Sequence, residues 1–274
     1  MAAERRANAD PVEETAVELL ALLGTGSQGR RYPELDTARA YAVVARVRAM
    51  REARGERPAG RKIGFTNMTI WPRYGVTAPM WNYVFDRTVR DLGAGSGGLD
   101  LAGLPEPRIE PEVVLHLGRA PSPGMSEAEL FGCVDWVAAG FEVVQSVYPG
   151  WKLTMPEATA AFGLHGALLI GPRHPVAADC AGWEHALGSF SVRLSRDGGP
   201  AIEGHATDVL GGPLKALGFL VEEIARHSPE AVLEAGEVVT TGTLTDAQPL
   251  GPAEAWSAAF DGIPFEPLRL TTRG

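Results

Sequence analysis

The chain has 274 residues and a formal net charge of −9 at pH 7, with 45% hydrophobic and 22% charged residues. These values are typical of a globular protein with one large domain, or with a small domain beside a larger one. The negative charge argues against nucleic acids and anionic membranes as partners. The chain has two cysteines and no apolar run near the roughly 18 residues of a membrane span, so we predict a cytoplasmic protein with free thiols.

Two amphipathic helices are the first predicted elements. The stretch DPVEETAVELLALLG begins at the capping residue Asp10 and has apolar residues at helical spacing. A second helix is predicted from Thr37 to about Arg54, where Gly55 ends it. We assign both helices to an N-terminal helical region over residues 1–75.

The segment GTGSQG, between the two helices, matches the pattern G-x-G-x-x-G at residues 24–29. That pattern binds a dinucleotide where a strand precedes it and a helix begins on it. Here a helix precedes it and RRYPEL follows it, so we predict an ordinary loop.

After residue 60 the pattern changes to short β-branched or aromatic runs bounded by Gly and Pro, which predict strands. Helical patterns occur over residues 125–140 and 212–228. Since strands and helices do not alternate, a doubly wound sheet is not expected. We predict an α+β protein in which residues 76–274 form a mostly β domain.

Two glutamates, Glu110 and Glu112, precede the apolar run of RIEPEVVLHL. Alternate side chains of a strand lie on one face, so these carboxylates are expected about 7 Å apart along the same face. Pro111 lies between them and predicts an edge, a bulge or a strand start, because proline has no N–H to donate. Two solvated acids at a strand end would fit the same pattern.

A third glutamate, Glu142, lies within the apolar run VAAGFEVVQS. An acid in such a run is either turned to solvent or buried and compensated by a cation. Together with Glu110 and Glu112 it would form an oxygen-ligand site, which suits Mg²⁺ or Mn²⁺ rather than zinc.

Lysine is rare in this chain, which has three lysines, Lys62, Lys152 and Lys215, among its 25 basic residues. Lys62 lies in the strand-like segment GRKIGFTN. It is either an ordinary surface lysine or a lysine near a metal and a dry pocket, where a lowered pKa suits acid–base chemistry.

The motifs GRKIGFTN, RIEPEVVLHL and FEVVQSVYPGWK resemble the 2-keto-4-pentenoate hydratase and 4-oxalocrotonate decarboxylase group of the fumarylacetoacetate hydrolase superfamily. The resemblance covers about residues 15–272. It implies an N-terminal helical region joined to a mixed β-sandwich roll, assembled as a homodimer or a larger homo-oligomer. It also implies that Glu110, Glu112 and Glu142 hold Mg²⁺ or Mn²⁺ and that Lys62 is the active-site lysine.

The resemblance suggests further site residues. Asp86 matches an aspartate that handles a proton or positions water, although a turn or capping acid would look the same. Thr243, in Thr-Gly-Thr, is expected as a donor to the substrate carboxylate. The segment PEATAAFGLHG departs from the group's pattern, so Phe162, His165 and Trp81 are expected to shape the distal end of the substrate pocket. His165 is either a new acid–base group or a structural histidine.

The resemblance implies a metal-dependent hydratase that adds water to a 2-hydroxy-dienoate or 2-oxo-enoate acid. The alternative within the group is a decarboxylase of a vinylogous 2-oxo diacid. A C–C bond hydrolase is less favoured, because such enzymes use an N-terminal His–Glu pair and this chain has no histidine before His116. A scaffold or binding protein is a fourth hypothesis, opposed by the cost of clustered acids without a cation.

Overall fold

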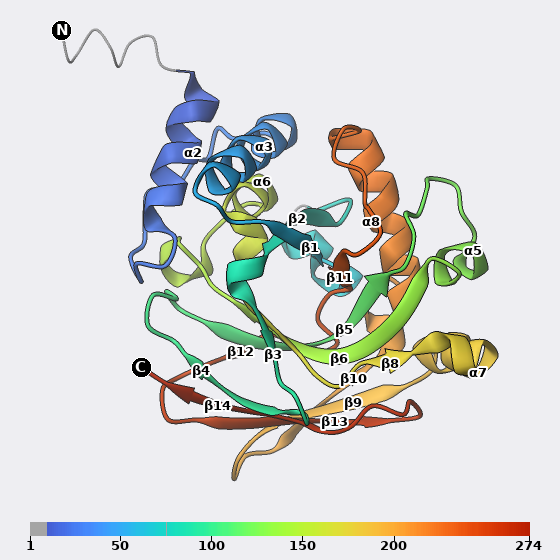
Figure 1. Cartoon of the computed structure of the whole chain (residues 1–274). Helices are drawn as coiled ribbons and strands as arrows, with labels where there is room; N and C mark the ends of the chain where they lie inside the picture. The colour runs from blue at the N-terminus through green and yellow to red at the C-terminus, as the bar shows by residue number, and fades with distance from the viewer. Residues whose placement is uncertain (1–9, 75) are drawn as a thin grey trace, which may run out of the picture.

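The computed structural model describes residues 10–74 and 76–274, which form two β-sheets with helices at one end and along one side (Figure 1). The α-helices are α2 (Pro11–Leu22), α3 (Thr37–Ala53), α4 (Trp71–Tyr74), α5 (Glu127–Phe131), α6 (Met155–Ala160), α7 (Cys180–Leu187) and α8 (Pro213–His227). Within the described residues, none of these helices has the length and apolar character needed to cross a membrane.

The larger sheet has nine strands, and its main path runs β2, β1, β11, β5, β6, β7, β3, with β12 pairing to β5 and β8 to β6. Its strands are β1 (Pro58–Gly64), β2 (Met80–Phe85), β3 (Val89–Asp91), β5 (Arg108–Leu117), β6 (Val134–Val144), β7 (His165–Ile170), β8 (His174–Pro175), β11 (Val238–Thr240) and β12 (Gln248–Pro249).

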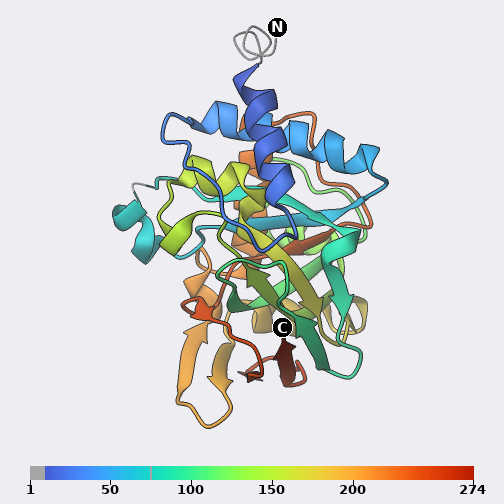
Figure 2. The same cartoon turned by 90° about the vertical axis from the view of Figure 1, so that its left-hand side faces the viewer.

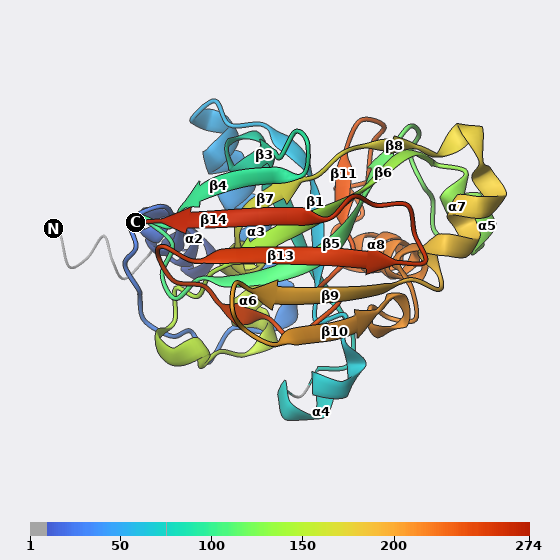
Figure 3. The same ribbon diagram turned by 90° about the horizontal axis from the view of Figure 1, so that it is seen from below.

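The smaller sheet has five strands in the order β10, β9, β13, β14, β4 and lies on the side away from α2 and α3 (Figures 1 and 3). Its strands are β4 (Ser96–Asp100), β9 (Ser191–Arg196), β10 (Ala201–His205), β13 (Ala255–Asp261) and β14 (Leu268–Arg273). The predicted α+β class is therefore confirmed.

The two N-terminal helices begin at aspartate caps, as predicted for the first. Asp10 accepts a hydrogen bond from Val12 N at 3.0 Å, and Asp36 accepts one from Arg39 N at 2.8 Å. Each carboxylate satisfies an N–H that the helix leaves without an internal partner. Figure 2 shows α2 and α3 crossing at the N-terminal end of the molecule.

The predicted domain boundary, residue 75, lies outside the described residues, as do residues 1–9 of the predicted helical region. β1 precedes this boundary and is a strand of the large sheet, paired in parallel with β11 and antiparallel with β2.

The helical pattern expected over residues 125–140 is wrong for its second half. α5 ends at Phe131, and β6 begins at Val134. β6 lies between β5 and β7, and most of its residues are buried. A strand covered on both faces reads as a continuous apolar run, which periodicity does not separate from a buried helix.

Pro111 lies inside β5, not at the predicted edge or strand start. Its carbonyl accepts a hydrogen bond from Leu244 N at 3.0 Å. Leu244 belongs to the connection between β11 and β12, the two strands that flank this part of β5. A residue's N–H and C=O point to the same side of a strand, so the missing N–H faces this connection and no regular ladder bond is lost.

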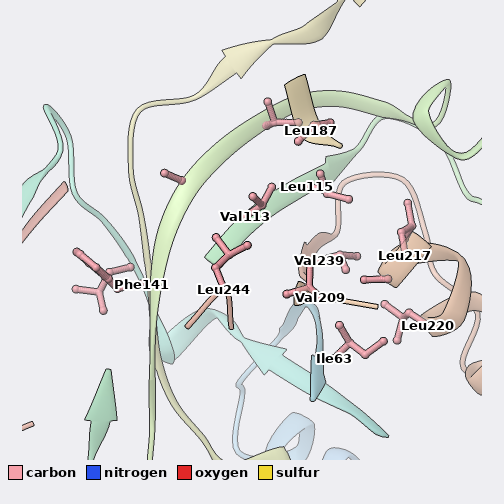
Figure 4. Close-up of a cluster of buried hydrophobic side chains, with 14 of the residues drawn as sticks. Ile63, Val113, Leu115, Phe141, Leu187, Val209, Leu217, Leu220, Val239 and Leu244 are labelled. Atoms are coloured by element: carbon pink, nitrogen blue, oxygen red, sulfur yellow. The ribbon is translucent and has the colours of Figure 1, made fainter. Parts of the chain in front are cut away.

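The two faces of β5 have different roles. Val113 and Leu115 lie on one face and belong to the main apolar core with Leu217 and Leu220 of α8 (Figure 4). Glu110 and Glu112 lie on the opposite face, which we call the inner face. Burial of the first face therefore fixes the register that turns both glutamates to the other.

We expect Leu115→Ala to destabilise the fold by about 2–5 kcal/mol, because Leu115 is fully buried and truncation leaves a cavity. Urea unfolding would measure this loss. Val232→Ala, at a side chain that is 59% exposed, should change stability by less than about 0.5 kcal/mol. Equal effects of the two substitutions would contradict this assignment of the core.

Candidate functional site

Three glutamates meet on the inner face of the large sheet. Glu110 of β5 lies directly opposite Glu142 of β6, and Glu112 lies two residues further along β5. One carboxylate oxygen from each of the three lies within 4.8 Å of the others. Glu112 and Glu142 are buried, and Glu110 is half-buried.

Glu112 is held by the Thr-Gly-Thr segment after β11. Its Oε2 accepts a hydrogen bond from Gly242 N at 2.8 Å. Glycine is required at 242, because φ is +101° and a Cβ there would lie 2.1 Å from Thr66 Oγ1. The other oxygen of Glu112, Oε1, is buried and has no hydrogen-bond partner among the described residues.

Lys62 reaches the glutamates from β1, on the other side of β11. Its Nζ lies 3.0 Å from Glu142 Oε2, and its side chain is 4% exposed. Gly163 packs against the stem of this lysine, since a Cβ at 163 would lie 3.2 Å from Lys62 Cδ. The ammonium group is thus confined beside the carboxylates.

His165 contacts the third glutamate from behind. Its Nδ1 lies 2.7 Å from Glu142 Oε1, and its Nε2 lies 2.8 Å from Thr88 Oγ1. An ionised carboxylate only accepts hydrogen bonds, so the ring proton that faces Glu142 must lie on Nδ1. Lys62 and His165 therefore bind different oxygens of Glu142 and fix its orientation.

The pKa values of the three glutamates differ widely from one another. Burial raises the pKa of Glu110 to about 7, against the opposing effect of Lys62. Burial and the neighbouring carboxylates Glu142 and Glu110 raise the pKa of Glu112 well above its usual value. Burial would also raise the pKa of Glu142, but Lys62 and His165 outweigh it and lower that pKa to about 2.

The pKa of Lys62 reflects two opposing effects. Burial lowers it, and the negative charges of Glu142, Glu110 and Glu112 outweigh burial, so the pKa lies above its usual value. A divalent cation at the carboxylates would offset those charges. Burial would then dominate the pKa of Lys62, and burial favours the neutral amine.

The cluster fits a hard divalent cation. It offers carboxylate oxygens alone, the ligand type that Mg²⁺ and Mn²⁺ prefer. The unpartnered Oε1 of Glu112 and the raised pKa values of Glu110 and Glu112 indicate an uncompensated negative charge at this position. Lys62 carries one positive charge, so it offsets the negative charge of only one of the three carboxylates.

A cavity of about 420 Å³ opens beside the glutamates. Its lining includes Lys62, Glu110, Glu112 and Thr243. Thr243 Oγ1 donates a hydrogen bond to Thr245 O at 2.7 Å. The apolar lining residues include Phe65, Met80, Leu153 and Leu164.

Trp81 does not line this cavity, contrary to expectation. Lys62 lies opposite Asn82 in the β1–β2 ladder, so alternation turns Trp81 to the other face of the sheet. There Trp81 stacks on Tyr41 of α3, with ring centroids 5.2 Å apart.

Asp86 also lies away from the cavity, in the turn after β2. Its carboxylate accepts a hydrogen bond from Arg57 N at 3.1 Å and lies 3.4 Å from Arg57 Nε. The backbone N–H of Arg57 lowers the pKa of Asp86. The structure thus favours the alternative of a turn acid over a catalytic role.

The segment AAFGLHG contributes residues other than those expected. Phe162 points into the core beneath the N-terminal helices, near Tyr148 and Ala160. Leu164 lines the cavity instead, and His165 lies behind Glu142 without lining it. Phe162, Gly163 and Leu164 all have positive φ, so the regular alternation that sequence reasoning assumes does not hold here.

Sequence reasoning missed Arg108 and Trp151, which line the same cavity. Arg108 could have been found, because it lies on β5 two residues before Glu110 and so shares its face. Trp151 follows an irregular loop, and no periodic signal places it.

We expect the affinity for Mg²⁺ to rise with pH. At pH 6 Glu110, with a pKa of about 7, carries a proton that the cation must displace, whereas at pH 8 it is mostly ionised. One such proton predicts an increase of about tenfold between pH 6 and pH 8. Calorimetric titration of the metal-free protein in two buffers of different ionisation enthalpy would measure both affinity and proton release; an affinity independent of pH would contradict the raised pKa.

We expect His165→Leu to weaken Mg²⁺ binding by about 10–100-fold, because Glu142 loses the donor that orients it. The matched control is His185→Leu, at an exposed histidine of α7, which should leave the affinity unchanged. Titration calorimetry at one pH would compare the two variants. Unchanged affinity in a folded His165→Leu variant would show that His165 does not position the ligand.

Comparisons with known proteins find similar chains among curated relatives and solved structures. No family model matches the chain. It is 28% identical over 235 residues to 2-hydroxyhexa-2,4-dienoate hydratase of Comamonas testosteroni, covering 85% of each chain. It is 29% identical over 231 residues to a 4-oxalocrotonate decarboxylase of a Pseudomonas species, covering 82% of this chain and 85% of the relative.

Solved structures share the fold. The 4-oxalocrotonate decarboxylase from Pseudomonas putida G7, complexed with magnesium and adipate, superposes with a TM-score of 0.85 at 22% identity, over 95% of this chain and 97% of that one. The fumarylpyruvate hydrolase from Pseudomonas aeruginosa, in complex with Mn²⁺ and pyruvate, gives a TM-score of 0.61 at 16% identity, over 78% and 88% of the two chains. The chain is thus similar over most of its length to the 2-keto-4-pentenoate hydratase and 4-oxalocrotonate decarboxylase group, as its motifs predicted, and it has the fold of the fumarylacetoacetate hydrolase superfamily.

Proposed function

We propose that the protein is a metal-dependent hydratase that adds water to a 2-hydroxy-dienoate or 2-oxo-enoate acid and gives a 4-hydroxy-2-oxo acid. The observation that carries this proposal is the meeting of three carboxylates and Lys62 beside one cavity. Sequence relatives named as hydratases of such acids support the reaction class.

Glu110, Glu112 and Glu142 would hold Mg²⁺ or Mn²⁺. A divalent cation here supplies Lewis-acid polarisation of the carboxylate and adjacent oxygen of a 2-oxo acid. Structural neighbours solved with magnesium, calcium or Mn²⁺ support a divalent cation of this kind. Gly242 N and His165 Nδ1 keep two of the three carboxylates in fixed orientations.

Lys62 moves the proton. Its Nζ is buried beside Glu142 and lines the cavity, where the neutral amine can take the proton of the 2-hydroxyl and deliver it to the terminal carbon of the dienol, which gives the conjugated enone. Water then adds to the conjugated carbon, and the hydroxyl and proton of that water complete the 4-hydroxy-2-oxo product. Phe65, Met80 and Leu164 offer an apolar wall to the unsaturated chain.

A decarboxylase of a vinylogous 2-oxo diacid is the second candidate. The structural neighbour with a TM-score of 0.85 and several sequence relatives carry that name, which favours it over C–C bond hydrolysis. The same carboxylates and lysine would act, and loss of CO₂ would replace addition of water.

We propose a cytoplasmic homodimer or larger homo-oligomer acting on a small 2-oxo acid. The net charge of −9 argues against nucleic acids and anionic membranes as partners, and the resemblance to this group implies that several copies assemble.

We expect Lys62→Met to lower turnover by about 10²–10⁴-fold while Mg²⁺ binding is retained, because the proton carrier is lost and the carboxylates remain. Lys215→Met, at an exposed lysine of α8, is the matched control and should keep wild-type turnover. Unchanged turnover in the Mg²⁺-loaded Lys62→Met variant would remove this role from Lys62.

The reaction itself is tested by incubating the Mg²⁺-loaded protein with a 2-hydroxy-dienoate and, separately, with a vinylogous 2-oxo diacid. Formation of a 4-hydroxy-2-oxo acid from the first supports the hydratase. Release of CO₂ from the second, with no hydration of the first, would favour the decarboxylase.

A further inference from the structure

Arg108 is a cavity-lining cation without an acidic partner. It begins β5 and is half-buried at the cavity wall. Among the described residues no carboxylate lies within 4.0 Å of its guanidinium, and no hydrogen bond to its side chain is formed. Most other arginines of the chain pair with acids, as Arg61 does with Glu237. The donors of Arg108 are therefore free for a ligand.

Trp151 supports this arginine from one side. The guanidinium carbon of Arg108 lies 4.2 Å from the centroid of the Trp151 ring. Stacking covers one face of the planar group and leaves its N–H donors at the edge, where a carboxylate binds with two parallel hydrogen bonds. A flexible surface arginine would lack such a platform.

Glu106 holds the Trp151 ring in place. Trp151 Nε1 donates to Glu106 O at 3.1 Å, and Gly150 N donates to Glu106 Oε1 at 2.9 Å. Gln28 Nε2 binds the same carboxylate oxygen at 3.0 Å. Glu106, two residues before Arg108, is thus engaged with the loop that holds Trp151, and it forms no ion pair with Arg108.

Arg108 lies on the same face of β5 as Glu110 and Glu112. Arg108, Glu110 and Glu112 alternate along the inner face of β5, so Arg108 lies about 7 Å from Glu110 along the strand. The cavity therefore has a carboxylate cluster with Lys62 at one end and an unpaired guanidinium at the other.

We propose that Arg108, held by Trp151, binds a second carboxylate at the distal end of the substrate, so that the enzyme takes dicarboxylic 2-oxo acids or their enols in preference to monocarboxylic ones. This inference rests on the proposed function for the end of the substrate that lies at the glutamates. Arg108 is the substrate-binding residue, and Trp151 is a positioning residue that acts through it.

The test compares two ligands that differ in the distal carboxylate alone, 2-oxoadipate and 2-oxohexanoate, by calorimetric titration of the Mg²⁺-loaded protein. The wild type should bind 2-oxoadipate at least about tenfold more tightly, as expected for a charged bidentate pair. Arg108→Gln should remove this preference and leave the affinity for 2-oxohexanoate within about twofold. Arg90→Gln, at an exposed arginine of β3, is the matched control and should keep the preference.

Two further variants separate binding from folding. Arg108→Lys keeps the charge but loses the planar stack, so it should retain part of the preference. Trp151→Leu should reduce the preference while Arg108 remains. With a substrate diacid, Arg108→Gln should raise KM far more than it lowers kcat.

Oxalate, which is too short to reach Arg108, tests the other end of the cavity. If oxalate binds with Mg²⁺ and the wild type binds the two longer acids equally well, the assignment of Arg108 is overturned and the proposed function stands. If oxalate fails to bind with Mg²⁺, the proposed function is overturned and this inference with it. Equal loss of affinity for both longer acids in Arg108→Gln would also contradict a distal carboxylate site.

Discussion

Repulsion among three carboxylates is the interaction on which the rest of the site depends. Glu110 and Glu142 lie directly opposite each other in a ladder whose register is fixed by the apolar core behind it, so they cannot move apart without breaking the sheet. Lys62 supplies a single positive charge, and the pKa of Glu110 remains near 7. A divalent cation bound between the three carboxylates would relieve this repulsion.

The parts of the site that follow local rules could be predicted from the sequence. Alternation along a strand placed Glu110 and Glu112 on one face. The apolar run around Glu142 left two alternatives, a solvent-facing acid or a buried and compensated one, and the structure shows the second. Lys62 stood out because lysine is rare in this chain, and its meeting with the glutamates followed from the resemblance. The capping role of Asp10 and the apolar periodicity of α8 could also be predicted from the sequence. Apart from that meeting, each of these features depends on neighbours in sequence alone.

Other parts could not be predicted, because they depend on strand register and on irregular backbone. Trp81 faces away from the cavity since Asn82, its neighbour, is the residue opposite Lys62. Asp86 lies in a turn, where its carboxylate binds Arg57. No residue spacing in the sequence predicts this contact. Phe162 and Leu164 have positive φ, so their side chains do not point in the directions that regular alternation predicts. Leu164 therefore lines the cavity, and His165 contacts Glu142. Leu164 and Trp151, which line the cavity, therefore come from irregular segments of the chain.

A crystal structure of the protein with Mn²⁺ and oxalate, recorded at the manganese absorption edge, would show whether these three carboxylates hold the cation. We expect one anomalous peak between the carboxylates of Glu110, Glu112 and Glu142, with oxalate bound beside that peak, at the end of the cavity away from Arg108. An absence of anomalous signal at these glutamates, with Lys62 still paired to Glu142 and oxalate bound elsewhere, would contradict it.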